Sequence, residues 1–122
     1  MSLLIKDGRI ISADNDYVAD LFVEEETVAE IGDHVDRPAD VTLDARGRYL
    51  IPGGIDVHTH LDAHVGGTIS SDDFATGTRA AAFGGTTCVI DFATQSQGER
   101  LMDALERWWD KGGRSTIDYG LH

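Results

Sequence analysis

The 122-residue sequence has little cysteine and little positive charge, and each shortage excludes a class of protein. Its one cysteine, Cys88, cannot form an internal disulfide or build a zinc site from thiolates, so any metal must be held by histidines and carboxylates. Ten lysines and arginines stand against 22 aspartates and glutamates, which gives a net charge of −12. That charge repels phosphate and anionic lipid, so we expect no nucleic-acid or membrane partner.

Long apolar segments are also missing from the sequence. No run approaches the ~18 residues of a membrane-spanning helix, and the N-terminal residues lack the basic start and cleavage site of a signal peptide. We therefore expect a cytoplasmic protein. A composition of 41% hydrophobic and 26% charged residues is typical of a globular chain with a packed core.

Residues 1–51 contain short apolar runs separated by turn signals, which predict a small β-sheet unit. Three pairs of short antiparallel strands are expected: residues 3–6 with 9–11 around Asp7-Gly8, residues 20–24 with 27–31 around Glu25-Glu26, and residues 41–44 with 48–51 around a loop with a left-handed Gly47.

From residue 52 onward strand and helix signals alternate, which is typical of parallel βα units. The expected strands are residues 54–58, 86–92 and 116–122, and the expected helices are residues 72–83 and 100–111. Ser70 or Ser71 is expected to cap the first helix, and a capping box of Ser96 and Glu99 the second. The second helix is expected to bury a face formed by Leu101, Leu105, Trp108 and Trp109, and strand 86–92 is expected to be buried on both faces.

The densest cluster of potential metal ligands is residues 56–62, which contain His58 and His60. Residues two apart on a strand point to the same side, so one strand can present both imidazoles to one metal ion. The end of a parallel strand is also where βα folds place their active sites. A histidine pair alone would more often be an ordinary surface feature.

The longer string Ile51-Pro52-Gly53-Gly54-Ile55-Asp56-Val57-His58-Thr59-His60-Leu61-Asp62 resembles the metal-binding signature of the amidohydrolase superfamily. Further strings resemble its cyclic-amidase branch, the dihydropyrimidinases and hydantoinases: residues 66–68, 72–78, 84–87, 89–92 and 118–122. The resemblance covers essentially the whole chain. It implies an α/β fold in which residues 1–51 are N-terminal β-sandwich strands and residues 52–122 begin a (β/α)8 TIM barrel, with three parallel strands and two helices of an incomplete barrel.

The resemblance further implies the N-terminal portion of a hydrolase that opens the ring amide of dihydropyrimidines or 5-substituted hydantoins. Two metal ions, usually zinc, would be bridged by hydroxide and a carboxylated lysine, and His58 and His60 match the ligands on the first strand. Lys6 and Lys111 are the only lysines and match no bridging position, so that lysine is absent from this chain. No catalytic residue is expected here, and we expect the chain alone to be inactive. The partners expected are a small cyclic amide and further copies of the protein.

Five other residues are candidates for supporting roles. Asp56 is expected to support the histidines rather than bind metal, and Asp91 either orients them or caps the loop that follows. The resemblance places Ala63, His64 and Val65 beside the pocket for the ring substituent. Hydantoinases carry larger apolar groups there, so this loop favours a bulkier or more polar substituent.

Three alternatives stay open at this point. An allantoinase or dihydroorotase would share the histidine strand. A non-catalytic scaffold, similar to the collapsin response mediator proteins, would keep the fold, although the retention of His58 and His60 argues against it. The chain could also exist in its own right as a β-unit with an α/β extension.

Overall fold

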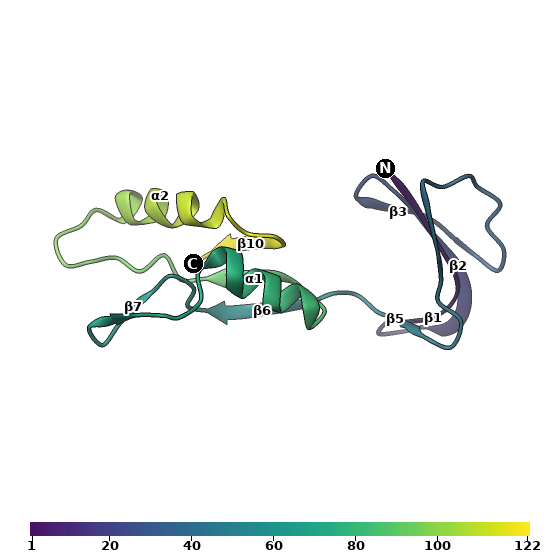
Figure 1. The fold of residues 1–122 in the computed structure, drawn as a ribbon, viewed down its shortest axis with the longest axis horizontal. Coiled ribbons are helices and arrows are strands. Elements are labelled where there is room, and N and C mark those ends of the chain that lie inside the picture. Colours follow the sequence, from purple (N-terminus) through teal and green to yellow (C-terminus); the bar gives the residue numbers. More distant parts are fainter. The chain divides into compact units, whose positions relative to one another are not determined.

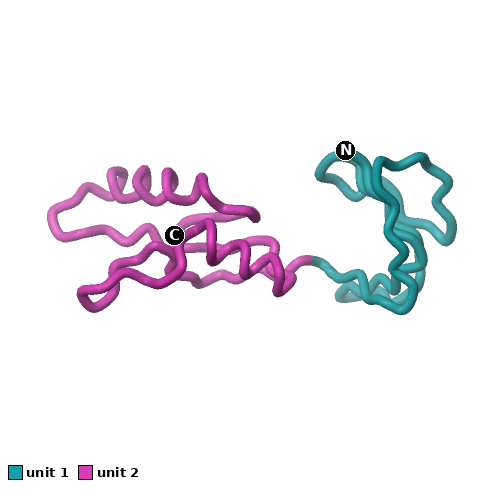
Figure 2. Tube along the Cα trace, viewed as in Figure 1, with its two compact units in different colours: residues 1–52 teal, residues 53–122 magenta.

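The computed structural model describes residues 1–122, which divide into two compact units, residues 1–52 and residues 53–122 (Figure 2). The first unit consists of strands, and the second combines strands with two helices, so the chain is mixed α/β (Figure 1). Neither helix has the length and apolar character needed to cross a membrane.

The first unit is a five-stranded sheet with the order β3-β2-β1-β4, in which β5 also pairs with β1. Its strands are β1 (Ser2–Ile11), β2 (Asp16–Glu24), β3 (Thr27–Gly32), β4 (Val41–Asp44) and β5 (Tyr49–Leu50). The β2–β3 hairpin confirms the prediction for residues 20–31, because Glu24 pairs with Thr27 and Glu25 takes a φ of 57° in the turn.

The predicted hairpin at Asp7-Gly8 is wrong, because residues 2–11 form the single strand β1. Asp7 alone takes a positive φ, of 56°, whereas a tight two-residue turn of this kind needs two such residues. The register against β2 shifts between Ile5 and Gly8 instead, so the chain bulges without reversing. The backbone N–H of Asp7 donates to Asp20 Oδ1 at 2.9 Å, which holds the bulge.

The predicted antiparallel pairing of residues 41–44 with 48–51 is also wrong. Strands β4 and β5 both pair parallel with β1, at two successive segments of it. The loop between them contains Gly47 with a φ of 74°, as predicted. A side chain at Gly8 would collide with that of Leu50, so this glycine allows β5 to pack closely against β1.

The core of the first unit contains Leu4, Phe22 and Val35. Asp20 is buried beside it, with 2% of its surface exposed, and its Oδ2 accepts the backbone N–H of Val35 at 3.1 Å. The hydrogen bonds from the Asp7 and Val35 backbones lower the pKa of Asp20 below its ordinary value. A buried carboxylate is thus retained because backbone donors stabilise its charge.

The second unit contains a three-stranded parallel sheet with the order β10-β9-β6. Its elements are β6 (Gly54–Thr59), β7 (His64–Val65), β8 (Thr68–Ile69), α1 (Phe74–Phe83), β9 (Thr86–Asp91), α2 (Leu101–Gly112) and β10 (Asp118–Leu121). This confirms the three parallel strands and two helices expected from the sequence. Strands β7 and β8 form a small separate hairpin in the loop after β6.

Asp73 caps α1, so the prediction of Ser70 or Ser71 is wrong. Asp73 Oδ1 accepts the backbone N–H of Thr76 at 2.8 Å, and Thr76 Oγ1 accepts the backbone N–H of Asp73 at 3.1 Å. Ser70 is engaged elsewhere, because its hydroxyl accepts the backbone N–H of Ala63 at 2.9 Å. Gly84 ends the helix, as predicted.

The capping box predicted for α2 is wrong as well, because Arg100 occupies the cap position and makes no side-chain capping bond. Glu99 Oε2 accepts the backbone N–H of Ser96 at 2.8 Å, which closes a turn ahead of the helix. Glu99 also pairs with Arg107, whose guanidinium lowers the pKa of Glu99 below its ordinary value. Ser96 and Glu99 therefore stabilise the loop before α2 and do not cap the helix.

The buried face of α2 differs from the predicted one. The residues it buries are Ala104, Trp108 and Gly112, which recur every four positions. Leu101 and Trp109 are 66% and 60% exposed, so the predicted face is wrong at these two positions.

The expectation that β9 is buried on both faces is wrong in this chain. Val89 and Asp91 are buried at 3% and 0% exposure, whereas Cys88 and Ile90 are half-buried. On the Asp91 face, Trp108 of α2 packs against the strand and donates its indole N–H to the Asp91 carboxylate.

Candidate metal-binding site

The histidine pair lies at the carboxyl end of β6. The pairing of β6 with β9 is irregular between Asp56 and Thr59, and Asp56 Oδ1 accepts the backbone N–H of His58 at 3.1 Å. This bond lets the strand end leave the regular ladder, and both imidazoles are exposed. Asp56 therefore contacts the backbone of His58 and not its ring.

The two rings approach each other closely, with 3.2 Å between His58 Nε2 and His60 Nε2. This distance fits one N–H···N hydrogen bond between the rings. It also fits two ligands of one tetrahedral zinc ion, because Zn–N bonds of about 2.0–2.1 Å place two such nitrogens about 3.3 Å apart. No group of three or more His, Cys, Asp and Glu residues is placed to hold a metal.

Contacts with one aromatic ring, that of Phe92, orient both imidazoles. His60 stacks on Phe92 with ring centroids 5.1 Å apart, and His58 lies 4.6 Å from the same ring. His122 stacks on Phe92 at 4.6 Å and its Nε2 lies 3.1 Å from the carbonyl oxygen of Val57. Phe92, directly after β9, is thus the centre of the cluster, a role that we did not predict.

Asp91 is fully buried and holds the chain on both sides of His60. Its Oδ2 accepts the hydroxyl of Thr59 at 2.8 Å and the backbone N–H of Leu61 at 2.7 Å. Its Oδ1 accepts the indole N–H of Trp108 at 3.2 Å. The contributions of Thr59 and Trp108 were missed, because neither spacing nor composition brings these residues to Asp91.

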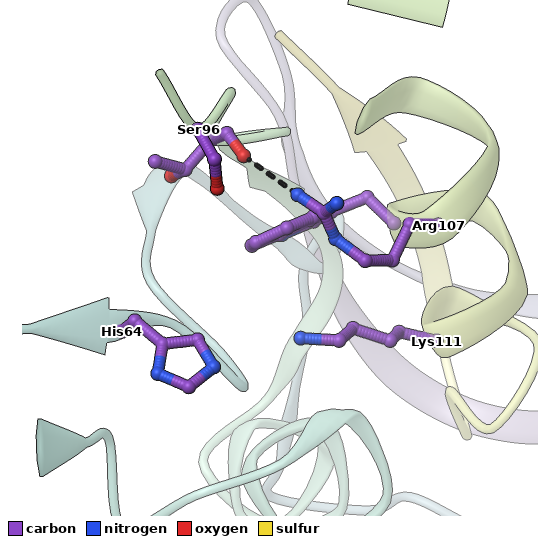
Figure 3. A pocket seen from close by; sticks show the side chains of 6 residues that line it. His64, Ser96, Arg107 and Lys111 are labelled. Atoms are coloured by element: carbon purple, nitrogen blue, oxygen red, sulfur yellow. Dashed lines mark hydrogen bonds between the residues drawn. The ribbon is translucent and has the colours of Figure 1, made fainter. Parts of the chain in front are cut away.

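The loop residues Ala63, His64 and Val65 are in different environments. Ala63 is buried at 2% exposure, whereas Val65 is 57% exposed on β7. His64 alone lines a cavity, of about 350 Å³, shown in Figure 3. The other residues that line it are Thr94, Ser96, Arg107, Trp108 and Lys111. The cavity is therefore lined by the Trp108 ring together with polar side chains, two of which, Arg107 and Lys111, are cationic.

An ion-pair network ties the loop after β6 to both helices. Arg114 contacts the carboxylates of Asp62 and Asp73, the latter at 3.0 Å. Hydrogen bonds from Thr76, together with Arg114, lower the pKa of Asp73 below its ordinary value. Asp62, whose φ is 54°, begins this loop, so its ion pair with Arg114 holds the start of the loop in place.

The parallel strands, the helices and the paired histidines at a strand end describe an α/β unit with a candidate metal site. Residues 49–112, more than half of the chain, match the profile described as the amidohydrolase family. The chain belongs to this family.

Among curated proteins, the chain is 50% identical to the D-hydantoinase of Geobacillus stearothermophilus, over 100% of the chain and 26% of that protein. It is 42% identical to the dihydropyrimidinase of Rattus norvegicus, over 98% of the chain and 24% of that protein. The chain spans about a quarter of the length of these relatives.

Similar solved structures also include those of dihydropyrimidinases and hydantoinases. The crystal structure of dihydropyrimidinase from Brevibacillus agri NCHU1002 matches with a TM-score of 0.95 and 47% identity, over 100% of this chain and 27% of that chain. The L-hydantoinase from Arthrobacter aurescens matches with a TM-score of 0.82 and 27% identity, over 98% of this chain and 27% of that chain.

Proposed function

We propose that the chain is the N-terminal portion of a metal-dependent cyclic amidohydrolase that opens the ring amide of dihydropyrimidines or 5-substituted hydantoins. The observation that carries the proposal is the 3.2 Å approach of His58 Nε2 and His60 Nε2 at a parallel strand end, in a chain of the amidohydrolase family. Relatives named D-hydantoinase and dihydropyrimidinase over the whole chain support the substrate class.

The proposal includes the fold of the longer protein. Residues 1–51 contribute strands to a β-sandwich, and residues 52–122 form the first part of a (β/α)8 barrel. The parallel order β10-β9-β6 supports this, because a barrel places such strands side by side with their carboxyl ends at one mouth. The site then opens at that mouth.

His58 and His60 fit a divalent metal, because both are exposed, the ring of Phe92 packs against both imidazoles, and their nitrogens are spaced as two ligands of one ion. When bound, two zinc ions would polarise the ring carbonyl and lower the pKa of the attacking water. The other ligands, a carboxylated lysine among them, would come from the rest of the full-length protein. Lys111 is already bonded to the carbonyl of Asp62 at 2.8 Å, and Lys6 lies on β1 in the other unit.

The residues of this chain would serve mainly to position the ligands. Asp91 holds Thr59 and Leu61, so it sets the direction in which His60 leaves the strand. Asp56 orients the backbone at His58 in the same manner. Of the residues proposed to face the ring substituent, Ala63, His64 and Val65, the buried Ala63 would act through the loop backbone. His64 would provide the polar contact.

The test uses the full-length protein with His58→Ala and His60→Ala, and with His34→Ala as the matched control. His34 is 74% exposed and lies in the other unit, so its loss should change neither readout. Metal content is measured by plasma mass spectrometry, and ring opening is measured on dihydrouracil and hydantoin. Each site variant should lose metal and turnover together. A metal-free active wild type, or turnover retained in both variants, contradicts the proposal.

The 122-residue chain by itself should bind zinc weakly and open no ring, because two imidazoles leave most coordination positions to water. Assays of the purified chain with added zinc test this. Turnover above buffer would mean that the remaining ligands of the site are not needed.

We also propose that the protein is a homo-oligomer. Ile55 and Val57 on β6 are 63% and 60% exposed, and such apolar surface costs about 25 cal/mol per Å² in water. The rest of the protein or a second copy must cover it. In the 122-residue chain by itself only a second copy can cover this surface, so sedimentation at micromolar concentration should show a dimer or larger species, and a stable monomer would contradict this expectation. Sedimentation of the full-length protein tests its own oligomeric state.

A further inference from the structure

The cavity lined by His64, Ser96 and Lys111 contains a cation without an anionic partner. Lys111 Nζ donates to the carbonyl oxygen of Asp62 at 2.8 Å and lies 4.3 Å from the centre of the Trp108 ring. Both partners are uncharged, and no carboxylate oxygen lies within 4.0 Å of the ammonium. An unpaired lysine is notable in a chain with a net charge of −12.

The second cation of the cavity is already neutralised. Arg107 pairs with both carboxylate oxygens of Glu99 and donates from Nη2 to the carbonyl of Thr94 at 3.1 Å. None of the lining residues is acidic. The cavity of about 350 Å³ therefore carries one uncompensated positive charge, that of Lys111.

Further donors face the same space. Figure 3 shows the amine end of Lys111 pointing toward the ring of His64, with Ser96 higher in the view, on the side of Arg107. The hydroxyl of Ser96 makes no hydrogen bond within the protein, since Ser96 bonds only through its backbone. Lys111 has two N–H groups left after its bond to Asp62. These groups are free to bind an anion.

We propose that this cavity binds one carboxylate group, with Lys111 as the charged donor and Ser96 as the neutral one. A carboxylate fits better than a phosphate because only one charge is uncompensated. Lys111 also lies in the last turn of α2, where the negative end of the helix dipole disfavours any anion, and a multiply charged one more strongly than a carboxylate. Charge-assisted bonds of about 2.7–2.9 Å to a carboxylate suit a single ammonium.

The carboxylate has two possible sources, an acidic substituent of the ring substrate or a free carboxylic acid. The first source rests on the proposed function. The acceptor of Lys111, Asp62, follows His60 by two residues, so the cavity adjoins the loop that leaves the histidine strand. An acidic group on the ring carbon could reach it from there.

The test measures binding to the full-length protein, freed of metal, by titration calorimetry. The probes are hydantoin-5-acetic acid, its neutral amide hydantoin-5-acetamide, and acetate alone. The acid should bind about tenfold more tightly than the amide, the effect of one charge-assisted hydrogen bond. Binding of acetate alone with the same dependence on Lys111 would assign the site to free carboxylates.

The variants are Lys111→Met, which removes the charge and keeps the stem over Trp108, and Lys111→Arg, which keeps the charge. Arg79→Met is the matched control, because Arg79 is exposed on α1 without a carboxylate partner and outside the cavity. Lys111→Met should abolish the preference for the acid, whereas Lys111→Arg and Arg79→Met should keep most of it. An equal preference in Lys111→Met and wild type overturns the proposal, as does the absence of any preference in wild type.

Circular dichroism of each variant checks folding. Should Lys111→Met unfold, Ser96→Ala provides the second test, with an expected loss of about threefold in affinity for the acid only. Failure of the proposed function is distinguishable from failure of this site. A wild type that opens no cyclic amide but binds acetate through Lys111 contradicts the proposed function and supports the carboxylate site. An active enzyme that binds the acid no more tightly than the amide supports the proposed function and contradicts the carboxylate site.

Discussion

Trp108 donates its indole N–H to the carboxylate of Asp91 at 3.2 Å, and both side chains are buried. The bond joins the middle of α2 to the end of β9. The same carboxylate holds Thr59 and Leu61, so one buried group connects a helix to the strand end that carries the histidines. The position of α2 is therefore coupled to the geometry of the candidate metal site.

Replacing Trp108 by phenylalanine should reduce the free energy of unfolding by about 1–3 kcal/mol, because Asp91 Oδ1 loses its donor inside the protein. Trp109→Phe is the matched control. Trp109 is 60% exposed, so its replacement should change the free energy by about 0.5 kcal/mol or less. Urea unfolding followed by circular dichroism measures both. Equal effects of the two substitutions would show that the indole bond contributes nothing.

Asp73 caps α1 in the structure, whereas the sequence alone suggests a nearby serine. Asp73→Ala removes both the acceptor for the Thr76 N–H and the contact with Arg114, and should cost about 1–2 kcal/mol. Ser71→Ala should have little effect, because Ser71 is exposed and the Thr76 N–H donates to Asp73 instead. Thermal unfolding of both variants measures the difference, and a larger loss for Ser71→Ala would refute the assigned cap.

Asp20 should make the stability of the first unit depend on pH in the acid range. Backbone hydrogen bonds from Asp7 and Val35 lower its pKa in the folded protein below the ordinary value of 3.8. The stabilisation is therefore complete above the unfolded pKa and is lost as the pH falls from about 4 through the lowered folded value. Asp20→Asn should flatten this part of the profile.

The control for Asp20 is Asp36→Asn, because Asp36 is exposed, whereas Asp20 is buried and accepts the backbone N–H of Val35. Unfolding by urea at several pH values between about 2 and 7 measures the three profiles. An unchanged profile in Asp20→Asn would assign the acid dependence to other carboxylates.

Gly112 should not tolerate a side chain. A Cβ atom there would collide with the ring of Tyr119 on β10, so Gly112→Ala should cost about 1–3 kcal/mol through overpacking. At the next position, Gly113, the nearest atom to an added Cβ is the carbonyl oxygen of Asp110 at 3.3 Å. Gly113→Ala should thus cost clearly less than Gly112→Ala, because that oxygen has to shift only slightly. The midpoints of urea unfolding of the two variants measure the difference.

The alternation of strand and helix signals after residue 52 was sufficient to predict the three parallel strands and two helices of the second unit, because apolar periodicity and Gly84 mark their limits. The short hairpin of β7 and β8 was not predicted. The pairing partners of the strands were harder to predict from the sequence. Asp7-Gly8 is typical of a hairpin, yet the donor from Asp7 to Asp20 stabilises a bulge within one strand. Whether the chain forms a hairpin or a bulge at this point depends on Asp20, which lies 13 positions away and so is not part of the local sequence pattern.

For the candidate site, the spacing of His58 and His60 was enough to expect two convergent imidazoles, and their nitrogens are indeed 3.2 Å apart. Their assignment as metal ligands remains a proposal. The supporting contacts could not be derived in the same way, because Phe92 and Trp108 come from different elements. Tertiary packing alone brings them to the end of β6.

The parallel pairing of β1 with β4 and β5 has a consequence for synthesis on the ribosome. Leu3 pairs with Val41, and Arg9 pairs with Tyr49, so the first strand stays without these neighbours until some forty further residues have been made. Contacts between such distant segments slow folding, because a long loop must close before any stabilisation is gained. At about 5–20 residues per second, the nascent β1 edge is exposed for a few seconds, a period in which chaperones can bind it.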